Sequence, residues 1–261
     1  MDANVKHDNH VMDKTKVKQS TPAAVTRYIN LIRKNIRERN TKTNDTKTRI
    51  KKLIRGIEFI LLFFGVPLLI YSGAFMKHPS LILLPILAGL ILYFIIKEDF
   101  NLKSLFHLNV PKEVIWKNIG LVLLTGVFLT GMVYLFTPEN LFNLPRKSPE
   151  TWLLLFILYP VFSAYSQEVI YRTFLFTRYK ILFRNSYFLI LISGITFGFM
   201  HIVYYHPLSM LLTLIAGIYL AWIYKRTRSV LFVAILHAIL GNLVFTIGLG
   251  EYFWLNMESQ I

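Results

Sequence analysis

The apolar residues of this chain form long blocks, and the polar residues are concentrated between the blocks and at the N-terminus. Most blocks are 17 to 20 residues long. Because a helix rises 1.5 Å per residue, about 20 residues cross a hydrocarbon core about 30 Å thick. The pattern therefore predicts transmembrane helices over Phe59–Met76, Ser80–Ile96, Ile119–Phe136, Thr151–Phe183, Ser186–Tyr205, Leu208–Tyr224 and Val230–Leu249.

The fourth block, Thr151–Phe183, is too long for one upright span and contains Pro160. Proline lacks the N–H that an α-helix interior uses, so we expect a kinked or broken helix there. The segment Asn101–Asn118 mixes apolar with charged residues, and we expect it to lie along the membrane interface. The fold class that follows is all-α, a polytopic transmembrane helical bundle of about seven spans.

Composition agrees with this pattern and narrows the chemistry. Hydrophobic residues make up 54% of the chain and charged residues 16%, whereas soluble domains average about 25% charged. The chain has no cysteine, which excludes disulfides, a thiol nucleophile and thiolate metal ligands. We expect no N-terminal secretion signal, because the first apolar block begins too deep in the chain.

The first 57 residues carry fifteen Lys or Arg and five acids. Their spacing predicts a helix with one apolar stripe and an opposite basic face, formed respectively by Val25, Ile29, Ile32, Ile36 and by Arg27, Arg33, Lys34, Arg37. Such a helix suits anionic membrane lipids. The alternative is that the basic tail only retains the N-terminus in the cytoplasm, a role that needs no binding partner. Nucleic acid is the competing partner, and we expect none because membrane spans follow directly.

Loop charges predict the topology. With the N-terminus in the cytoplasm, the inner loops 97–118, 177–185 and 225–229 carry ten Lys or Arg, and the outer loops carry three. Positive charge favours the cytoplasmic side, so we expect an integral protein of the cell membrane with a cytoplasmic N-terminus. Three regions follow: a basic tail (1–56), three N-terminal spans (57–149) and a four-span core (150–250).

The four-span core contains polar residues that cost free energy in a membrane. An ionisable side chain at mid-helix costs about 2.5–3.5 kcal/mol on insertion scales. The fourth block holds Gln167, Glu168 and Arg172, the fifth His201, and the seventh His237 and Asn242. Taken singly, each has a structural explanation: a Glu–Arg pair four residues apart, an interfacial histidine, and an interhelical hydrogen bond.

Taken together, these side chains favour hydrolysis. A carboxylate in a low-dielectric site can act as a general base for water, while imidazole and carboxamide groups can donate to an oxyanion. Alternatively, Glu168, His201 and His237 could ligate zinc, with Asn242 or water completing the shell. Both arrangements support the same class of reaction.

In these motifs the chain resembles the CAAX prenyl protease and bacteriocin-processing (CPBP, or Abi) family of intramembrane proteases. The family pattern is Glu-Glu-x-x-x-Arg, then Phe-x-x-x-His, then a late His followed by Asn. Here it is matched by Gln167 to Arg172, Phe197 to His201, and His237 to Asn242, within about residues 150–250. The resemblance implies an endopeptidase acting on a membrane-associated protein or peptide, with no cofactor required and zinc as the alternative.

Carried over from the family, Glu168 is the base with His201 as its partner, Arg172 positions Glu168, and His237 with Asn242 stabilises the oxyanion. This sequence departs from the pattern twice. Gln167 replaces the first glutamate and cannot take a proton. The asparagine follows His237 by five residues, with Gly241 at the usual fourth place, so Asn242 requires a local bulge to reach the site.

Two other functions remain open. The first is a catalytically weak or inactive member that acts as a membrane scaffold, regulator or immunity protein, which Gln167 favours. The second is a transporter or channel that uses the intramembrane polar groups. The sequence shows no inverted repeat, which disfavours the second.

Overall fold

The computed structural model describes residues 22–73, 80–97, 101–183 and 185–253, and every regular element in these ranges is helical. The all-α fold class is therefore confirmed. The chain divides into two compact units, residues 1–53 and 54–261. Helix α1 (Pro22–Ile60) supplies the described part of the first unit and continues into the second.

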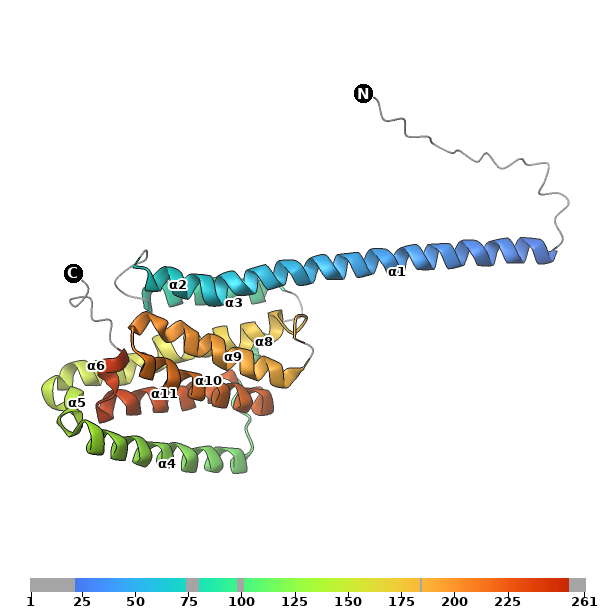
Figure 1. Cartoon of the computed structure of the whole chain (residues 1–261). Helices are drawn as coiled ribbons and strands as arrows, with labels where there is room; N and C mark the ends of the chain where they lie inside the picture. The colour runs from blue at the N-terminus through green and yellow to red at the C-terminus, as the bar shows by residue number, and fades with distance from the viewer. Residues whose placement is uncertain (1–21, 74–79, 98–100, 184, 254–261) are drawn as a thin grey trace, which may run out of the picture. The chain divides into compact units, whose positions relative to one another are not determined.

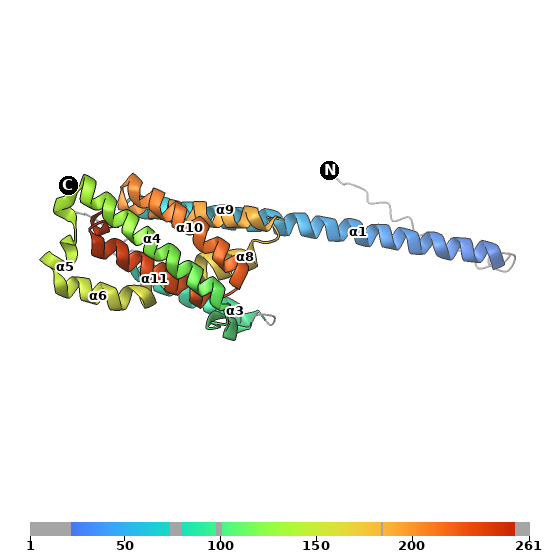
Figure 2. The same cartoon turned by 90° about the horizontal axis from the view of Figure 1, so that it is seen from below.

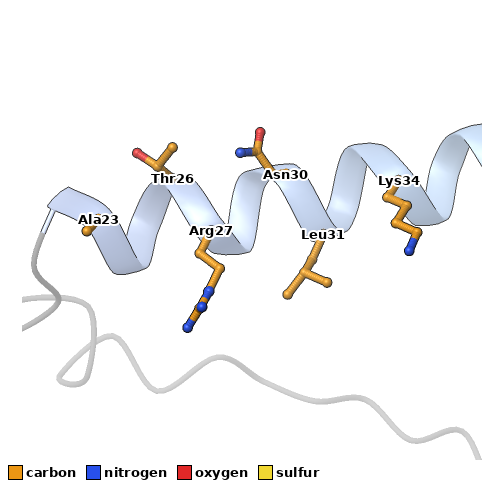
Figure 3. Close-up of a pocket in the computed structure, with 6 residues that line it drawn as sticks. All are labelled: Ala23, Thr26, Arg27, Asn30, Leu31 and Lys34. Atoms are coloured by element: carbon orange, nitrogen blue, oxygen red, sulfur yellow. The ribbon is translucent and has the colours of Figure 1, made fainter.

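In the first unit, the side chains of Ile29, Ile32 and Ile36 are exposed, as are the basic residues of the helix. The side chain of Val25, which completes the expected stripe, lies outside the described residues. Figure 3 shows a shallow hollow on this helix, lined by Ala23, Thr26, Arg27, Asn30, Leu31 and Lys34. Thr26 and Asn30 point to one side of the ribbon, and Arg27 and Leu31 to the other. The described residues of the predicted apolar stripe and basic face are thus exposed, and their contact with membrane lipid stays a prediction.

The second unit is a bundle of helices (Figures 1 and 2). After α1 its α-helices are α2 (Val66–Tyr71), α3 (Ser80–Ile96), α4 (Lys112–Phe136), α5 (Asn143–Lys147), α6 (Pro149–Tyr159), α7 (Ser166–Glu168), α8 (Leu175–Arg178), α9 (Ser186–Met200), α10 (Pro207–Thr227) and α11 (Val230–Ile247). The π-helical segments are η2 (Leu61–Gly65), η5 (Pro160–Tyr165) and η6 (Val169–Phe174). The 3-10 turns are η3 (Leu102–Leu105), η4 (Pro138–Asn140), η7 (His201–Tyr204) and η8 (Gly250–Phe253).

Six described helical segments are long and apolar enough to cross a membrane, and Leu83–Ile96 is a shorter apolar helix. The outer surface of α4 exposes large apolar side chains such as Leu123, Val127 and Phe128, with relative exposures of 65%, 74% and 62%. An apolar surface of this kind suits lipid contact and not water. The predicted polytopic membrane protein is therefore confirmed.

The third span is longer than its apolar block. Helix α4 begins at Lys112, whereas the hydrophobic pattern predicted a start at Ile119. The second half of the segment 101–118 thus forms the first turns of α4, and its position at the membrane interface stays a prediction. Asn118 is compatible with this helix because it donates to the Val114 carbonyl at 2.6 Å and accepts from the hydroxyl of Tyr219.

The fourth block forms one continuous helical path from Pro149 to Arg178. It does not end at Pro160; instead the path widens there into the π-helical segment η5, and a second π segment, η6, follows after Glu168. Proline removes an i→i−4 hydrogen bond, and π segments relieve such strain and occur often at functional sites. The expected irregularity at Pro160 is present as a local widening of the helix.

Helices α9 and α10 pack closely because glycines line their contact. A Cβ at Gly194 would lie 2.8 Å from the Ile218 backbone nitrogen, and one at Gly198 would lie 2.9 Å from Leu214 Cα. Two glycines four residues apart allow such close approach between membrane helices. Helix α10 also contacts α11, α11 contacts η5, and α9 contacts η6, so α9, α10 and α11 pack together with the fourth block.

The end of α1 is fixed to the end of the fourth block through Glu58. Its carboxylate accepts hydrogen bonds from Arg178 (Nη2 at 2.7 Å), from the Tyr179 hydroxyl at 2.7 Å and from Arg55 at 3.1 Å. The guanidinium of Arg178 also lies 4.4 Å from the ring centroid of Tyr93. The carboxylate of Glu58 thus joins helices that are distant in sequence.

Candidate functional site

Glu168 lies in α7, between the two π segments, and is fully buried. The Nε atom of Arg172, also fully buried, is 2.9 Å from Glu168 Oε2. The contact is an ion pair without hydrogen-bond geometry. Arg172 Nη1 donates to Ser193 Oγ on α9 at 2.6 Å, and Ser193 donates to the Tyr171 carbonyl at 2.8 Å. The pair expected from the four-residue spacing is present and is anchored to the neighbouring helix.

His237, on α11, is held through both ring nitrogens. Its Nδ1 lies 2.9 Å from Glu168 Oε1, and its Nε2 lies 2.9 Å from the hydroxyl of Tyr159. The carboxylate beside Arg172 is an acceptor, so Nδ1 carries the hydrogen, and in the tautomer with its hydrogen on Nδ1 alone Nε2 accepts from Tyr159. The sequence paired Glu168 with His201; the structure pairs it with His237, because α11 presents His237 to the Glu168 carboxylate.

His201 ends α9 and begins the 3-10 turn η7. Its Nδ1 lies 2.8 Å from the Phe197 carbonyl oxygen. A carbonyl only accepts, so Nδ1 donates and Nε2 keeps a lone pair. The Phe197 ring lies beside both histidines, with centroid separations of 4.9 Å from His201 and 5.4 Å from His237. The two imidazoles therefore border one region, although they come from different helices.

A cavity of about 80 Å³ opens between the fourth block, α9, α10 and α11. A cavity of this size is large enough to hold water, which needs about 10–15 Å³ by this measure. Its polar lining residues are Tyr159, Ser163, Gln167, His201, Tyr204, Thr213 and His237. Its other lining residues are Phe197, Leu212, Ala216, Leu240, Gly241, Val244, Phe245 and Phe253. Glu168 and Arg172 are not part of this lining, and Glu168 contacts the lining residue His237.

Gln167 faces the cavity from the fourth block. Its Nε2 donates to Ser163 Oγ at 2.8 Å, whereas its buried Oε1 has no hydrogen-bond partner among the described residues. A buried acceptor of this kind is costly unless water or a ligand satisfies it. The Gln167 carbonyl oxygen is therefore suited to accept a hydrogen bond from a molecule in the cavity.

The structure contradicts the expected position of Asn242. Helix α11 is α-helical from Val230 to Ile247, without the bulge that Asn242 needs to join His237. The Asn242 Nδ2 atom donates instead to the Phe156 carbonyl of α6 at 3.1 Å. In a regular helix, five residues turn the side chain by about 140° away from that of His237. Asn242 therefore connects α11 to α6 and does not line the cavity.

The space beside Gly241, one helical turn after His237, is occupied by the side chain of Tyr159. A Cβ at this position would lie 2.3 Å from Tyr159 Cε1 and 2.4 Å from the Tyr159 hydroxyl oxygen. Glycine within a helix costs about 0.8–1.0 kcal/mol relative to alanine, and here it gives the tyrosine room to reach Nε2. The sequence analysis did not identify Tyr159. The glycine one turn after His237 is the signal that could have indicated a large side chain packed there.

The predicted zinc ligands do not form a metal site. Within the described ranges, no group of three His, Asp or Glu side chains could hold a metal ion. Both nitrogens of His237 are engaged, and both oxygens of Glu168 contact His237 or Arg172. The donor set of Glu168, His201 and His237 thus does not converge on one point, and no reaction step is derived through a metal.

Comparison with known proteins agrees with the motifs. Residues 149–243 match the family model described as type II CAAX prenyl endopeptidase Rce1-like. This segment, less than half of the 261 residues, contains the buried ion pair, both histidines and most of the cavity. The match confirms the predicted resemblance to the CAAX protease family and, at family level, indicates a CAAX-type intramembrane endopeptidase. No curated protein and no solved structure matches the chain.

Proposed function

We propose that this chain is an endopeptidase that hydrolyses a peptide bond of a membrane-associated protein or peptide inside the bilayer. The observation that carries the proposal is a cavity large enough for water within membrane helices, bordered by two imidazoles and supported by a fully buried Glu–Arg pair. Prenylated peptides with a CAAX C-terminus are the first substrates to test, because the matched family is named for them.

In the proposed reaction His201 is the general base. The hydrogen bond from Nδ1 to the Phe197 carbonyl leaves Nε2 as an acceptor on a side chain that lines the cavity. A water held between Nε2 of His201 and Oε1 of Gln167 can lose a proton to the imidazole as it attacks the carbonyl carbon. A positioned base typically accelerates such a step about 10²–10⁴-fold.

Glu168 has a different role here from the base that the resemblance implied. Its carboxylate is fully buried behind the lining and already contacts Arg172 and His237. It therefore sets the tautomer and orientation of His237, and Arg172 balances its charge. A carboxylate that orients an imidazole in this way is an established arrangement in hydrolases.

The test uses membranes that contain wild type, His201→Ala or the matched control His107→Ala. Incubation with a prenylated CAAX peptide and mass spectrometry of the products measures the cleavage rate. Wild type and His107→Ala should cleave at similar rates, because His107 lies outside the cavity. His201→Ala should lose at least about 10²-fold. Equal rates for wild type and His201→Ala would contradict the proposal.

A comparison of membrane-protein termini extends the test to unknown substrates. Cells carrying wild type or His201→Ala should differ in at least one new terminus. If neither approach yields a product that depends on His201, the protein is not an endopeptidase.

The second candidate function is a membrane scaffold, regulator or immunity protein with little or no turnover. Gln167 favours it, because an amide at the cavity cannot take a proton as a carboxylate can. Gln167→Glu separates the two functions. It should raise the cleavage rate if the missing carboxylate limits the wild type, and change it little if His201 already suffices as base. A cavity that remains inactive in both forms supports the scaffold.

A further inference from the structure

Tyr159 is a polar residue of the cavity lining to which the proposed function gives no role. It ends α6, immediately before Pro160 and the π segment η5. Its hydroxyl lies 2.9 Å from His237 Nε2, and its ring meets those of His237 and Phe245 edge to face. The hydroxyl is thus fixed at the cavity wall by a hydrogen bond and by two ring contacts.

The hydrogen-bond chain determines the direction of each donor. Arg172 faces the Glu168 carboxylate, the carboxylate accepts from His237 Nδ1, and His237 Nε2 accepts from Tyr159. In this arrangement His237 offers no N–H to the cavity. The donor beside it that can reach a substrate oxygen is the tyrosine O–H.

Two of the other hydroxyl and amide donors of the lining already donate to protein groups, and the remaining hydroxyls of the lining are those of Ser163 and Tyr204. Thr213 donates to the Ser209 carbonyl at 2.6 Å, and the Gln167 amide donates to Ser163. The absence of a side chain at Gly241 gives Tyr159 its space, since a Cβ at position 241 would overlap the ring and hydroxyl of Tyr159. Two independent features, the hydrogen bond and the missing side chain, thus place the same hydroxyl beside His237.

Resting on the proposed function, we infer that Tyr159 is a catalytic residue whose hydroxyl binds the oxyanion during peptide hydrolysis. As water attacks, its oxygen bonds to the carbonyl carbon, the C=O π pair moves to the carbonyl oxygen, and the water proton passes to His201 Nε2. The Tyr159 O–H turns from His237 Nε2 to the new oxyanion. When the C–N bond breaks, the amine takes the proton from His201, the C=O bond re-forms, and Tyr159 donates to His237 again.

This role predicts a defined kinetic change. Removing one oxyanion donor typically lowers kcat about 10²–10³-fold. Tyr159→Phe should therefore lose at least about 10²-fold in kcat with little change in KM. The matched control is Tyr165→Phe in the same helical path, whose hydroxyl donates to the Leu105 carbonyl and does not line the cavity. It should cleave the prenylated peptide at a rate close to that of wild type.

A rescue variant separates chemistry from packing. Tyr159→Ala removes the donor and the ring that excludes a side chain at position 241. Residue 241 lies one turn from His237 on the same helix face, so Gly241→Asn in this background places an amide donor in the vacated space. The kcat of the double variant should be at least about tenfold higher than that of Tyr159→Ala, because an asparagine can also stabilise an oxyanion. Gly241→Asn alone should remain impaired.

Binding gives a readout that needs no turnover. A peptidyl phosphinate presents tetrahedral, negatively charged oxygens, whereas the matching peptide amide does not. Tyr159→Phe should weaken binding of the phosphinate to the detergent-solubilised protein at least tenfold and binding of the amide less than twofold.

Each result decides between the proposals. If His201 is required for cleavage but Tyr159→Phe retains wild-type kcat, the role of Tyr159 is wrong and the proposed function stands. If the wild type neither cleaves the peptide nor prefers the phosphinate to the amide, both are wrong. Loss of phosphinate preference in Tyr159→Phe supports the role of the hydroxyl even in a protein with slow turnover.

Discussion

The buried ion pair makes a quantitative prediction about stability. Glu168→Gln keeps the size of the side chain and an oxygen that can accept from His237 Nδ1. It removes the negative charge that lies 2.9 Å from Arg172 Nε, and both side chains have 0% exposure. The guanidinium is then buried with no anion beside it, and the amide N–H groups of glutamine face its donors.

The size of the effect follows from the geometry. Two unit charges whose centres are about 4 Å apart interact by about 4 kcal/mol at an effective dielectric constant of about 20. Breaking buried pairs by removing one partner typically costs about 3–5 kcal/mol. We therefore expect Glu168→Gln to lower the unfolding free energy by about 3 kcal/mol or more. The double variant Glu168→Gln/Arg172→Met should cost much less than the two single changes added together.

Unfolding in mixed detergent and SDS micelles, followed by the fluorescence of the four tryptophans, measures these differences. The matched control is Glu38→Gln, which removes the partner of an ion pair with side-chain exposures of 72% and 65%. Such pairs contribute about 0–1 kcal/mol, so this variant should unfold like the wild type. A change below about 1 kcal/mol for Glu168→Gln, or additive effects in the double variant, would refute the reasoning.

Three further predictions concern packing, anchoring and topology. Gly198→Ala should lower the unfolding free energy by about 1–3 kcal/mol through overpacking, because its Cβ would contact the backbone of α10 too closely. Gly120→Ala is the control, since a Cβ there has no atom within 4 Å and should leave the unfolding free energy unchanged. Thermal unfolding in detergent compares the two variants. Glu58→Gln should lower the unfolding free energy by about 1.5–3 kcal/mol, because Arg55, Arg178 and Tyr179 lose a charged hydrogen-bond acceptor. Thermal unfolding in detergent tests this, and an unchanged midpoint would argue against a stabilising role of the Glu58 carboxylate. Because the chain has no cysteine, Ser148→Cys and Lys225→Cys can be labelled singly. An impermeant maleimide should label the first in intact cells and the second only after lysis; the reverse pattern would overturn the predicted cytoplasmic N-terminus.

The sequence predicted the local features of the site and missed the long-range ones. Glu168 and Arg172 are four residues apart on one helix, so their pairing follows from helical geometry. The contact between Glu168 and His237 joins residues 69 positions apart and depends on how α11 packs against the fourth block. Periodicity carries no information about such packing, and the pairing of Glu168 with His201 was implied only by the family resemblance.

Asn242 and Tyr159 show the same limit. The order of the motifs indicated an asparagine near His237, but the regular course of α11 directs Asn242 toward α6. Tyr159 lies in a block of apolar and aromatic residues, where nothing in the pattern distinguishes it from a lipid-facing side chain. Its position became visible only through the distance to His237 and the clearance at Gly241.

The amino-acid pattern was enough to predict a helical membrane protein and the residue types of its interior. The reason is that lipid leaves backbone groups unsatisfied unless they bond within a helix, so block length reports the fold directly. The tertiary structure decided which polar side chains meet: His237 with Glu168 and Tyr159, and His201 with its own helix end. Those contacts arise from the packing of three separate helical segments, whose relative rotation no single segment encodes.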